Sequence, residues 1–175
     1  MKKLFFILLF FTISVNSFAQ MITQKTGYVN SEVIYEQYAP AIKAQSDLEA
    51  LASKWRASRD SMVAEFQKKF TDYQNKAETM QEAERQLAEQ ELAGDNQAIQ
   101  EYEQQKFGQG GDFFIKQAEL YKPIRERVLK VIEAVAGEEG YNFVFDKTET
   151  TSVLLYGDSD FDITFKVLDR LKKDK

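Results

Sequence analysis

The sequence predicts an α+β fold that is mostly α: a long antiparallel helical hairpin projecting from a small body of β-strands. Residues 41–136 contain one proline, are rich in Gln, Glu, Lys and Ala, and carry apolar residues three, four or seven positions apart. This spacing is typical of a helical seam close to a coiled-coil period. Short segments with the period of strands lie at both ends of the chain. A polar helix with so narrow an apolar stripe cannot form a compact globule, so we expect an extended coiled-coil arm.

Residues 1–19 have the composition of a signal peptide. Lys2 and Lys3 form a charged start, Leu4–Ile13 is an apolar stretch, and Ser17–Ala19 supplies small residues for a signal peptidase. We expect cleavage after Ala19. A membrane anchor is the alternative, but the apolar stretch is shorter than the ~20 residues that a membrane span needs.

Composition argues against several classes of function. Without Lys2 and Lys3 the chain has 21 basic and 28 acidic residues, a net charge of −7, whereas nucleic-acid binders present a basic surface. The chain has no Cys and no His, which removes thiol chemistry and the commonest general base and metal ligand. No phosphate-binding loop or pair of nucleophile and base is present. We therefore predict a protein that is not an enzyme and has no cofactor or metal.

The N-terminal part of the body is expected within residues 20–40. Gly27–Asn30 has the β-branched and aromatic composition of a short strand. Ser31–Tyr38 is predicted to be a short helix with Ser31 as its N-cap. Pro40 suits the first turn of the helix that follows, because a helix start does not need its missing N–H.

The first limb of the hairpin is expected at residues 41–78 and its tip near residues 78–82. Thr79 and Glu82 have the spacing of a capping box, which marks the start of a new helix. A continuous helix through this point is the alternative. The distinction matters because only a hairpin returns the chain to the body.

Gly108, Gly110 and Gly111 interrupt the second limb, residues 80–136. Each glycine costs ~1 kcal/mol in a helix interior relative to Ala. The glycines face roughly residues 51–55, which leaves three interpretations: close approach of Trp55 to the backbone, a hinge, or a break between two helices. We favour a flexible hinge. Pro123 should kink the helix further on.

The C-terminal part of the body is expected at residues 137–175. Gly137 and Gly140 end the long helix, residues 141–145 and 152–156 are predicted strands, and a last helix begins at residues 162–164. About 60 residues make a marginal core, so we expect the body to oligomerise. The residues expected to build this oligomerisation body are Val29, Val33, Ile34, Phe143, Val144, Phe145, Leu154, Leu155, Ile163, Val167 and Leu168.

Apolar side chains on the arm are candidates for binding another protein. A two-helix arm has no deep core, so part of its aromatic surface should remain accessible. Such a surface suits unfolded, apolar chains. The candidate client-binding residues are Met62, Phe66, Phe70, Tyr73, Tyr102, Phe107, Phe113 and Phe114.

Together, these features resemble the Skp/OmpH family of periplasmic chaperones over the whole mature chain. The terminal segments are the most specific marks, whereas the helical arms alone would not identify the family. The matching segments are Gly27–Asn30, Tyr121–Ile124, Ala134–Ala136, Gly140–Asp146, Val153–Tyr156 and Asp162–Leu168.

The resemblance implies a homotrimer in the periplasm, in which strands of three subunits form a small barrel and three helical arms enclose a cavity. Such proteins hold unfolded outer-membrane proteins without ATP, with no stable membrane insertion. One feature departs from the family: its best-known member is strongly basic, whereas residues 80–106 here carry two basic and seven acidic residues. Attraction to anionic lipid should be weak there, so we assign no lipopolysaccharide site.

The sequence leaves two other functions as alternatives. A structural coiled-coil scaffold or spacer of the cell envelope would bind one folded partner and ignore unfolded chains. An enzyme is disfavoured by the missing His, Cys and site motifs.

Overall fold

The computed structural model describes residues 24–148 and 153–173. The predicted signal peptide and Ser152 lie outside the described residues. The elements in order are β1 (Thr26–Val29), α2 (Ser31–Gln37), α3 (Ala39–Lys76), α4 (Glu82–Phe107), α5 (Asp112–Glu139), β2 (Phe143–Asp146), a 3-10 turn η1 (Ser159–Phe161) and α6 (Thr164–Lys173). The predicted α+β, mostly helical class is confirmed.

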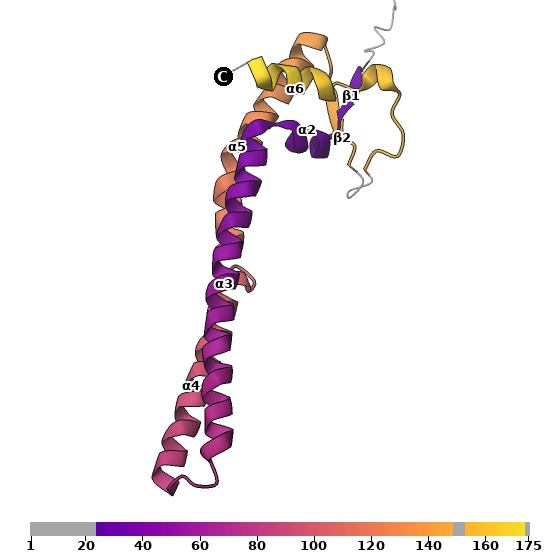
Figure 1. The fold of residues 1–175 in the computed structure, drawn as a ribbon. Coiled ribbons are helices and arrows are strands. Elements are labelled where there is room, and N and C mark those ends of the chain that lie inside the picture. Colours follow the sequence, from indigo (N-terminus) through magenta and orange to yellow (C-terminus); the bar gives the residue numbers. More distant parts are fainter. Residues whose placement is uncertain (1–23, 149–152, 174–175) are drawn as a thin grey trace, which may run out of the picture.

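The molecule has a body at one end and a long two-layered arm (Figure 1). Helix α3 runs away from the body, and α4 and α5 return beside it. The body gathers β1, α2, β2 and α6 around the ends of α3 and α5. Segments from both ends of the chain therefore lie together, separated in sequence by the whole arm.

A parallel pair of strands joins the two ends of the chain. β1 pairs with β2 from Thr26 opposite Phe143 to Val29 opposite Asp146. The other edge of β1 forms a single bridge between Tyr28 and Asp162. β1 is thus covered on both edges by segments from the C-terminal part of the chain.

The strand predicted at residues 152–156 is not formed by residues 153–156, and this prediction was wrong for the single chain. A strand needs a neighbour to pair with. Both edges of β1 are already occupied, and residues 153–156 are not paired with the outer edge of β2. The side chains of Val153, Leu155 and Tyr156 are exposed.

The cap of the first short helix differs from the prediction by one residue. Asn30, not Ser31, is the N-cap of α2, and its side chain accepts a hydrogen bond from the Val33 N–H at 3.1 Å. Ser31 instead donates from its hydroxyl to Asp146 at 2.6 Å, which ties α2 to the end of β2. Pro40 lies in the first turn of α3, as predicted.

The hydrophobic core lies in the body and in the part of the arm nearest to it. It combines residues from five elements, so neither end of the chain forms it alone. Its buried members are Val29, Ile34, Ala41, Ala44, Ile124, Val128, Val131, Val135, Ile163, Val167, Leu168 and Leu171.

The turn between α3 and α4 occupies residues 77–81. Thr79 was predicted as an N-cap, but α4 begins after Gln81, which makes no side-chain capping bond. The Thr79 hydroxyl instead donates to the Lys76 carbonyl at 2.9 Å, so it closes the end of α3. The capping-box pattern was therefore misleading, because its threonine serves the preceding helix.

The glycine segment is a break between α4 and α5, the third of the three interpretations. Gly110 has φ +74°, a conformation that favours glycine. A Cβ on Gly108 would lie 2.4 Å from the Gln104 carbonyl oxygen, and one on Gly111 2.7 Å from that of Gln105. The steric interpretation was wrong, because the crowding atoms belong to the preceding helical turn and not to Trp55. α5 continues through Pro123 and ends at Gly140, which has φ +73°.

The outer part of the arm has no buried core. Between Ala52 and Ile124, a stretch that the structure describes throughout, no residue is buried. We call α3 after Ala52, the turn and α4 the distal arm (residues 53–107). Polar contacts join its two limbs: Lys69 binds Glu91 at 2.6 Å and Asp95 at 2.8 Å, and the Tyr73 hydroxyl donates to Glu89 at 2.5 Å.

The two helices that form these limbs, α3 and α4, carry net charges of opposite sign. α3 has seven basic and five acidic residues, whereas α4 has two basic and seven acidic ones. Hydrogen bonds to Asp95 and Glu91 raise the pKa of Lys69. Because the pKa of Lys69 is raised in the folded chain, the stabilisation from its contacts with Glu91 and Asp95 is fully present below the ordinary lysine pKa. This stabilisation is lost only as pH rises through the pKa of Lys69 in the folded state. The distal arm therefore keeps this contact at neutral pH.

We predict that the distal arm loosens selectively with salt. Between about 0.01 M and 1 M ionic strength the Debye length falls from ~30 to ~3 Å, which screens exposed ion pairs. Amide hydrogen exchange should accelerate more in α4 than in the end of α5 that packs in the core. Lys69→Met should reproduce part of this effect at low salt. The control Lys43→Met, which removes an exposed pair within α3 to Asp47, should not. Equal acceleration in α4 and α5 would contradict an electrostatic seam.

Candidate functional site: apolar surfaces of the arm and body

The eight candidate client-binding residues fall into two groups on the arm. Met62, Phe66, Phe70 and Tyr73 follow one another along the distal half of α3. Phe66 and Phe70 stack with ring centroids 6.0 Å apart, and Phe70 is 41% exposed. The other three are half-buried against α4. This group is thus a shallow apolar strip, and its two end residues, Met62 and Tyr73, also line small hollows beside α4.

The second group surrounds the break between α4 and α5. Phe107 lies 6.1 Å from Trp55 and 6.4 Å from Phe113, measured between ring centroids. Phe113 in turn meets Phe114 edge-on at 5.7 Å, and Phe114 is 48% exposed. We call Trp55, Phe107, Phe113 and Phe114 the mid-arm cluster. Tyr102 lies one turn before it on α4.

Cations border the mid-arm cluster. The Lys106 ammonium lies 5.3 Å from the Trp55 ring centroid and the Arg56 guanidinium 5.8 Å from that of Phe107. Lys106 also binds Asp112 at 2.5 Å, which links the two helices across the break. The predicted set missed Trp55, Arg56 and Lys106. The signal was present in the sequence, since Trp55 was expected opposite the glycines.

Four more large apolar residues are exposed on the arm and were not predicted as candidates. They are Ile42, Leu87, Ile115 and Leu129, and each is at least half exposed. Their positions lie off the apolar seam, and a search for apolar residues on the polar face would have found them.

The predicted body residues divide by burial. Five of the eleven are buried inside the single chain and support its own core: Val29, Ile34, Ile163, Val167 and Leu168. Val33, Val144 and Leu154 are half-buried. Phe143, Phe145 and Leu155 are exposed, and of the eleven only these three present a large part of an apolar side chain to an approaching molecule.

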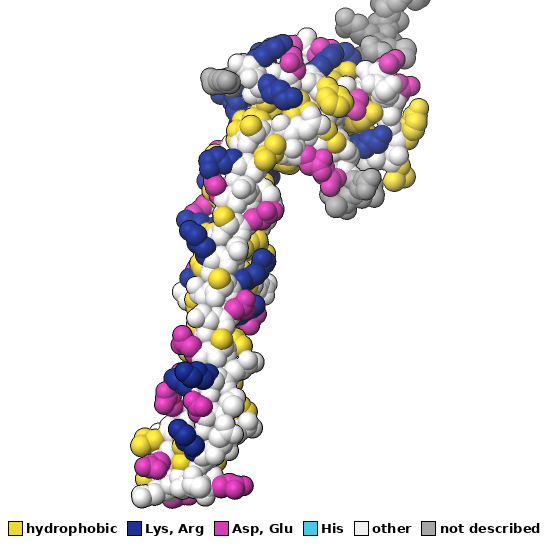
Figure 2. All heavy atoms as spheres, in the orientation of Figure 1, with side chains coloured by type: hydrophobic (Ala, Val, Ile, Leu, Met, Phe, Trp, Pro, Cys, Tyr) yellow, Lys and Arg dark blue, Asp and Glu magenta, His cyan; other side chains and the backbone are white. Residues whose placement is uncertain are grey.

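The structure adds further exposed apolar residues to the body. Leu155 is 88% exposed and Tyr156 79%, which is unusual for large side chains. We define the body surface as the exposed residues Phe143, Phe145, Val153, Leu155, Tyr156, Phe161 and Phe165. Figure 2 shows hydrophobic side chains on the body and along the arm, among blue and magenta charged side chains on both.

Neither metal sites nor membrane spans occur in the part of the chain that the structure describes. Residues 24–148 and 153–173 contain no group of three or more potential metal ligands of the His, Cys, Asp or Glu type. None of the helices there is long and apolar enough to span a membrane.

Comparison with known proteins gives a family and a structural relative. Residues 25–171 match the model of the family described as outer membrane protein (OmpH-like). A crystal structure from Caulobacter crescentus CB15, described as a candidate OmpH-like outer membrane chaperone, matches with a TM-score of 0.73. The match has 11% identity and covers 87% of this chain and 86% of that one, so it supports the fold alone. No curated protein matches this chain. Since the family model spans most of its length, the chain belongs to the OmpH-like outer membrane protein family.

Proposed function

We propose that this protein is an ATP-independent holdase that binds unfolded outer-membrane proteins in the periplasm and prevents their aggregation. The observation that carries the proposal is an arm with exposed aromatic residues and no buried residue between Ala52 and Ile124. Membership of the OmpH-like family and the fold shared with an OmpH-like structure support it.

The arm surface suits a client that has no fixed structure. Phe70, Phe114 and Ile115 are each about half exposed, and Phe70 on α3 lies further toward the tip of the arm than the other two on α5. Burying apolar area contributes roughly 25 cal/mol per Å² without demanding a particular direction. Many such contacts can hold an unfolded chain, and no single contact must be strong. Binding of this kind needs no nucleotide.

Location and assembly belong to the same proposal. The signal peptide directs the chain to the periplasm with cleavage after Ala19, and the mature protein does not insert stably into the membrane. Three copies associate through the body surface. Residues 153–156 supply a strand to a neighbouring copy, where the outer edge of β2 has no strand beside it among the described residues.

The break at residues 108–111 acts as a hinge that adapts the cavity between arms to the client. Spin labels at Ala93 and Gln117 would lie on opposite sides of the break. We expect a broad distribution of distances between them that narrows when a client binds. A single narrow distribution, unchanged by the client, would remove the hinge from the proposal.

The holdase is tested by light scattering of an unfolded outer-membrane barrel diluted from denaturant. The protein should suppress aggregation at stoichiometric ratio. The double variant Phe70→Ser and Phe114→Ser should require about three- to tenfold more protein, because it removes two exposed aromatic contacts. The control variant, Gln67→Ser and Gln117→Ser, alters exposed polar positions on the same helices and should behave as wild type. Failure of the wild-type protein to suppress aggregation would favour a coiled-coil scaffold instead.

The assembly is tested by the mass in solution. Light scattering should give the mass of three chains. Leu155→Asp should shift the mass toward one chain, because it places a charge at the most exposed apolar residue of the body surface. Asp160→Asn, in the neighbouring exposed turn, should leave the mass unchanged. A wild-type monomer or dimer would refute the trimer.

A further inference from the structure

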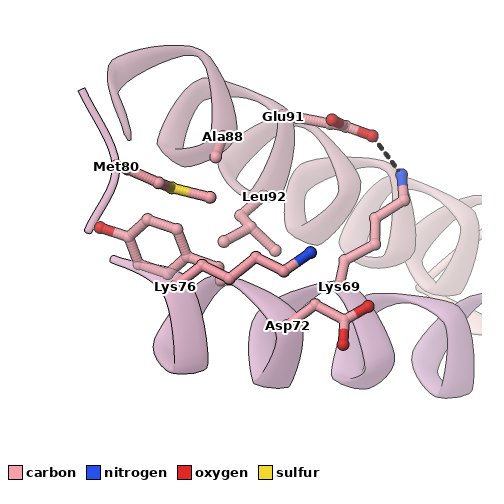
Figure 3. Close-up of a pocket in the computed structure, with 8 residues that line it drawn as sticks. Lys69, Asp72, Lys76, Met80, Ala88, Glu91 and Leu92 are labelled. Atoms are coloured by element: carbon pink, nitrogen blue, oxygen red, sulfur yellow. Dashed lines mark hydrogen bonds and ion pairs between the residues drawn. The ribbon is translucent and has the colours of Figure 1, made fainter. Parts of the chain in front are cut away.

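A hollow lies between α3 and α4 next to the tip of the arm (Figure 3). Its volume is about 190 Å³. Tyr73, Met80, Ala88 and Leu92 form its apolar lining, and the Lys76 side chain lies along it. The hollow is smaller than the roughly 300–1,000 Å³ of small-molecule sites. Its size and open shape suit one apolar side chain of a partner.

A second, smaller hollow of about 100 Å³ follows along the same seam. Its apolar lining is Met62, Ala98 and Ile99, and Lys69 borders both hollows. The Lys69 ammonium lies between them, bound to Glu91 beside the first and Asp95 beside the second. The two hollows are therefore consecutive openings in one groove.

The two hollows are related by seven residues on each helix. On α4, the positions 88, 91 and 92 of the first hollow become 95, 98 and 99 in the second. On α3, the positions 69, 72 and 76 become 62, 65 and 69. Seven residues at 1.5 Å each place the hollows ~10.5 Å apart along the arm.

This spacing selects the conformation of an occupant. A helix repeats the same face after seven residues, which is again ~10.5 Å, so side chains i and i+7 would enter both hollows. A β-strand laid along the groove presents one face every ~6.8 or ~13.6 Å, at i+2 or i+4. Neither strand spacing matches. The groove fits a third helix lying along the two that form it.

The charges around the groove constrain the occupant further. The α4 wall belongs to a helix with net charge −5, and the single positive charge of Lys69 faces two of its carboxylates, Glu91 and Asp95. The α3 side of the hollows adds Lys76 and the carboxylates of Glu65 and Asp72. Lys76, at the tip end of the groove, has no ion-pair partner among the described residues. A matching helix would therefore carry basic residues on the flank facing α4 and an acidic residue near Lys76.

We propose that the distal arm seats a basic amphipathic helix, with apolar residues at i and i+7 in the two hollows. This goes beyond the proposed holdase function, because it assigns to the arm a partner with regular structure. It shares with that function the premise that the arm is the binding part of the protein, and the two candidate residues Met62 and Tyr73.

The test uses the full mature protein and synthetic helical peptides of about 18 residues, or five turns. The probe peptide has Leu at i and i+7 on a Lys-rich, Ala-based helix with one Glu. The control peptide has the same composition with the second Leu at i+5. Methyl NMR of labelled methionine reads each hollow separately, since Met80 lines the first and Met62 the second.

We expect the probe peptide to shift the Met80 and Met62 signals together and saturably, and the control peptide to bind at least about tenfold more weakly. Ala88→Phe and Ala98→Phe fill the hollows and should each weaken binding of the probe about tenfold. Ala93→Phe, at an exposed α4 position outside both hollows, should not. Circular dichroism checks that each variant keeps its helices.

Equal binding of the two peptides, or a shift of only one methionine, would overturn the groove. So would unchanged binding in both filled variants. Suppression of barrel aggregation, measured on the same proteins, separates this result from the proposed function. A protein that binds the probe peptide but fails to hold the barrel keeps the groove and loses the holdase, and the reverse outcome does the opposite.

Discussion

The parallel pairing of β1 with β2 is the constraint on which the rest of the structure depends. The paired segments are 117 residues apart, as shown by the bond between Lys25 and Asn142. Parallel strands require a crossover connection, and here that connection is the whole arm. The chain must leave the body along α3 and return along α4 and α5. The four paired residues on each strand therefore join the segment that leads into the arm to the segment that follows it.

This topology separates the buried contacts from the binding surface. The core collects residues from both chain ends and from the nearby parts of α3 and α5. Two helices further out have no third layer to cover them, so their apolar residues are at best half-buried. Polar contacts such as Lys69 to Glu91 and Asp95 then set the register where packing cannot. Exposed ion pairs contribute little each, so the distal arm has weaker stabilising contacts than the part of the arm that packs in the core.

Local sequence patterns predicted the elements well. The predictions failed where contacts between distant segments determine the structure. The helical seam and the strand at Phe143 were predictable because their periods of 3.6 and two are visible within a few residues. Thr79 closes one helix instead of opening the next, and the capping pattern alone does not distinguish these roles. Residues 153–156 have the composition of a strand, but composition cannot show whether a partner strand is available. Ile163 and Leu155 were both predicted as residues of the body, but Ile163 is buried in the chain's own core and Leu155 is exposed.

Because the distal arm has no buried core, it offers a partner two kinds of contact. One kind requires only apolar side chains of the partner, and the other requires side chains at a fixed spacing. The strip around Phe70 and the mid-arm cluster offer apolar area without order, which suits a client that has no repeat of its own. The two hollows beside Lys69 repeat with the heptad of the helices that form them, because side chains at equivalent positions leave equivalent gaps. Hollows on the surface of a coiled coil thus repeat with the same heptad period as the helices that form it. It therefore discriminates among partners by their spacing, whereas the exposed aromatics discriminate only by apolarity.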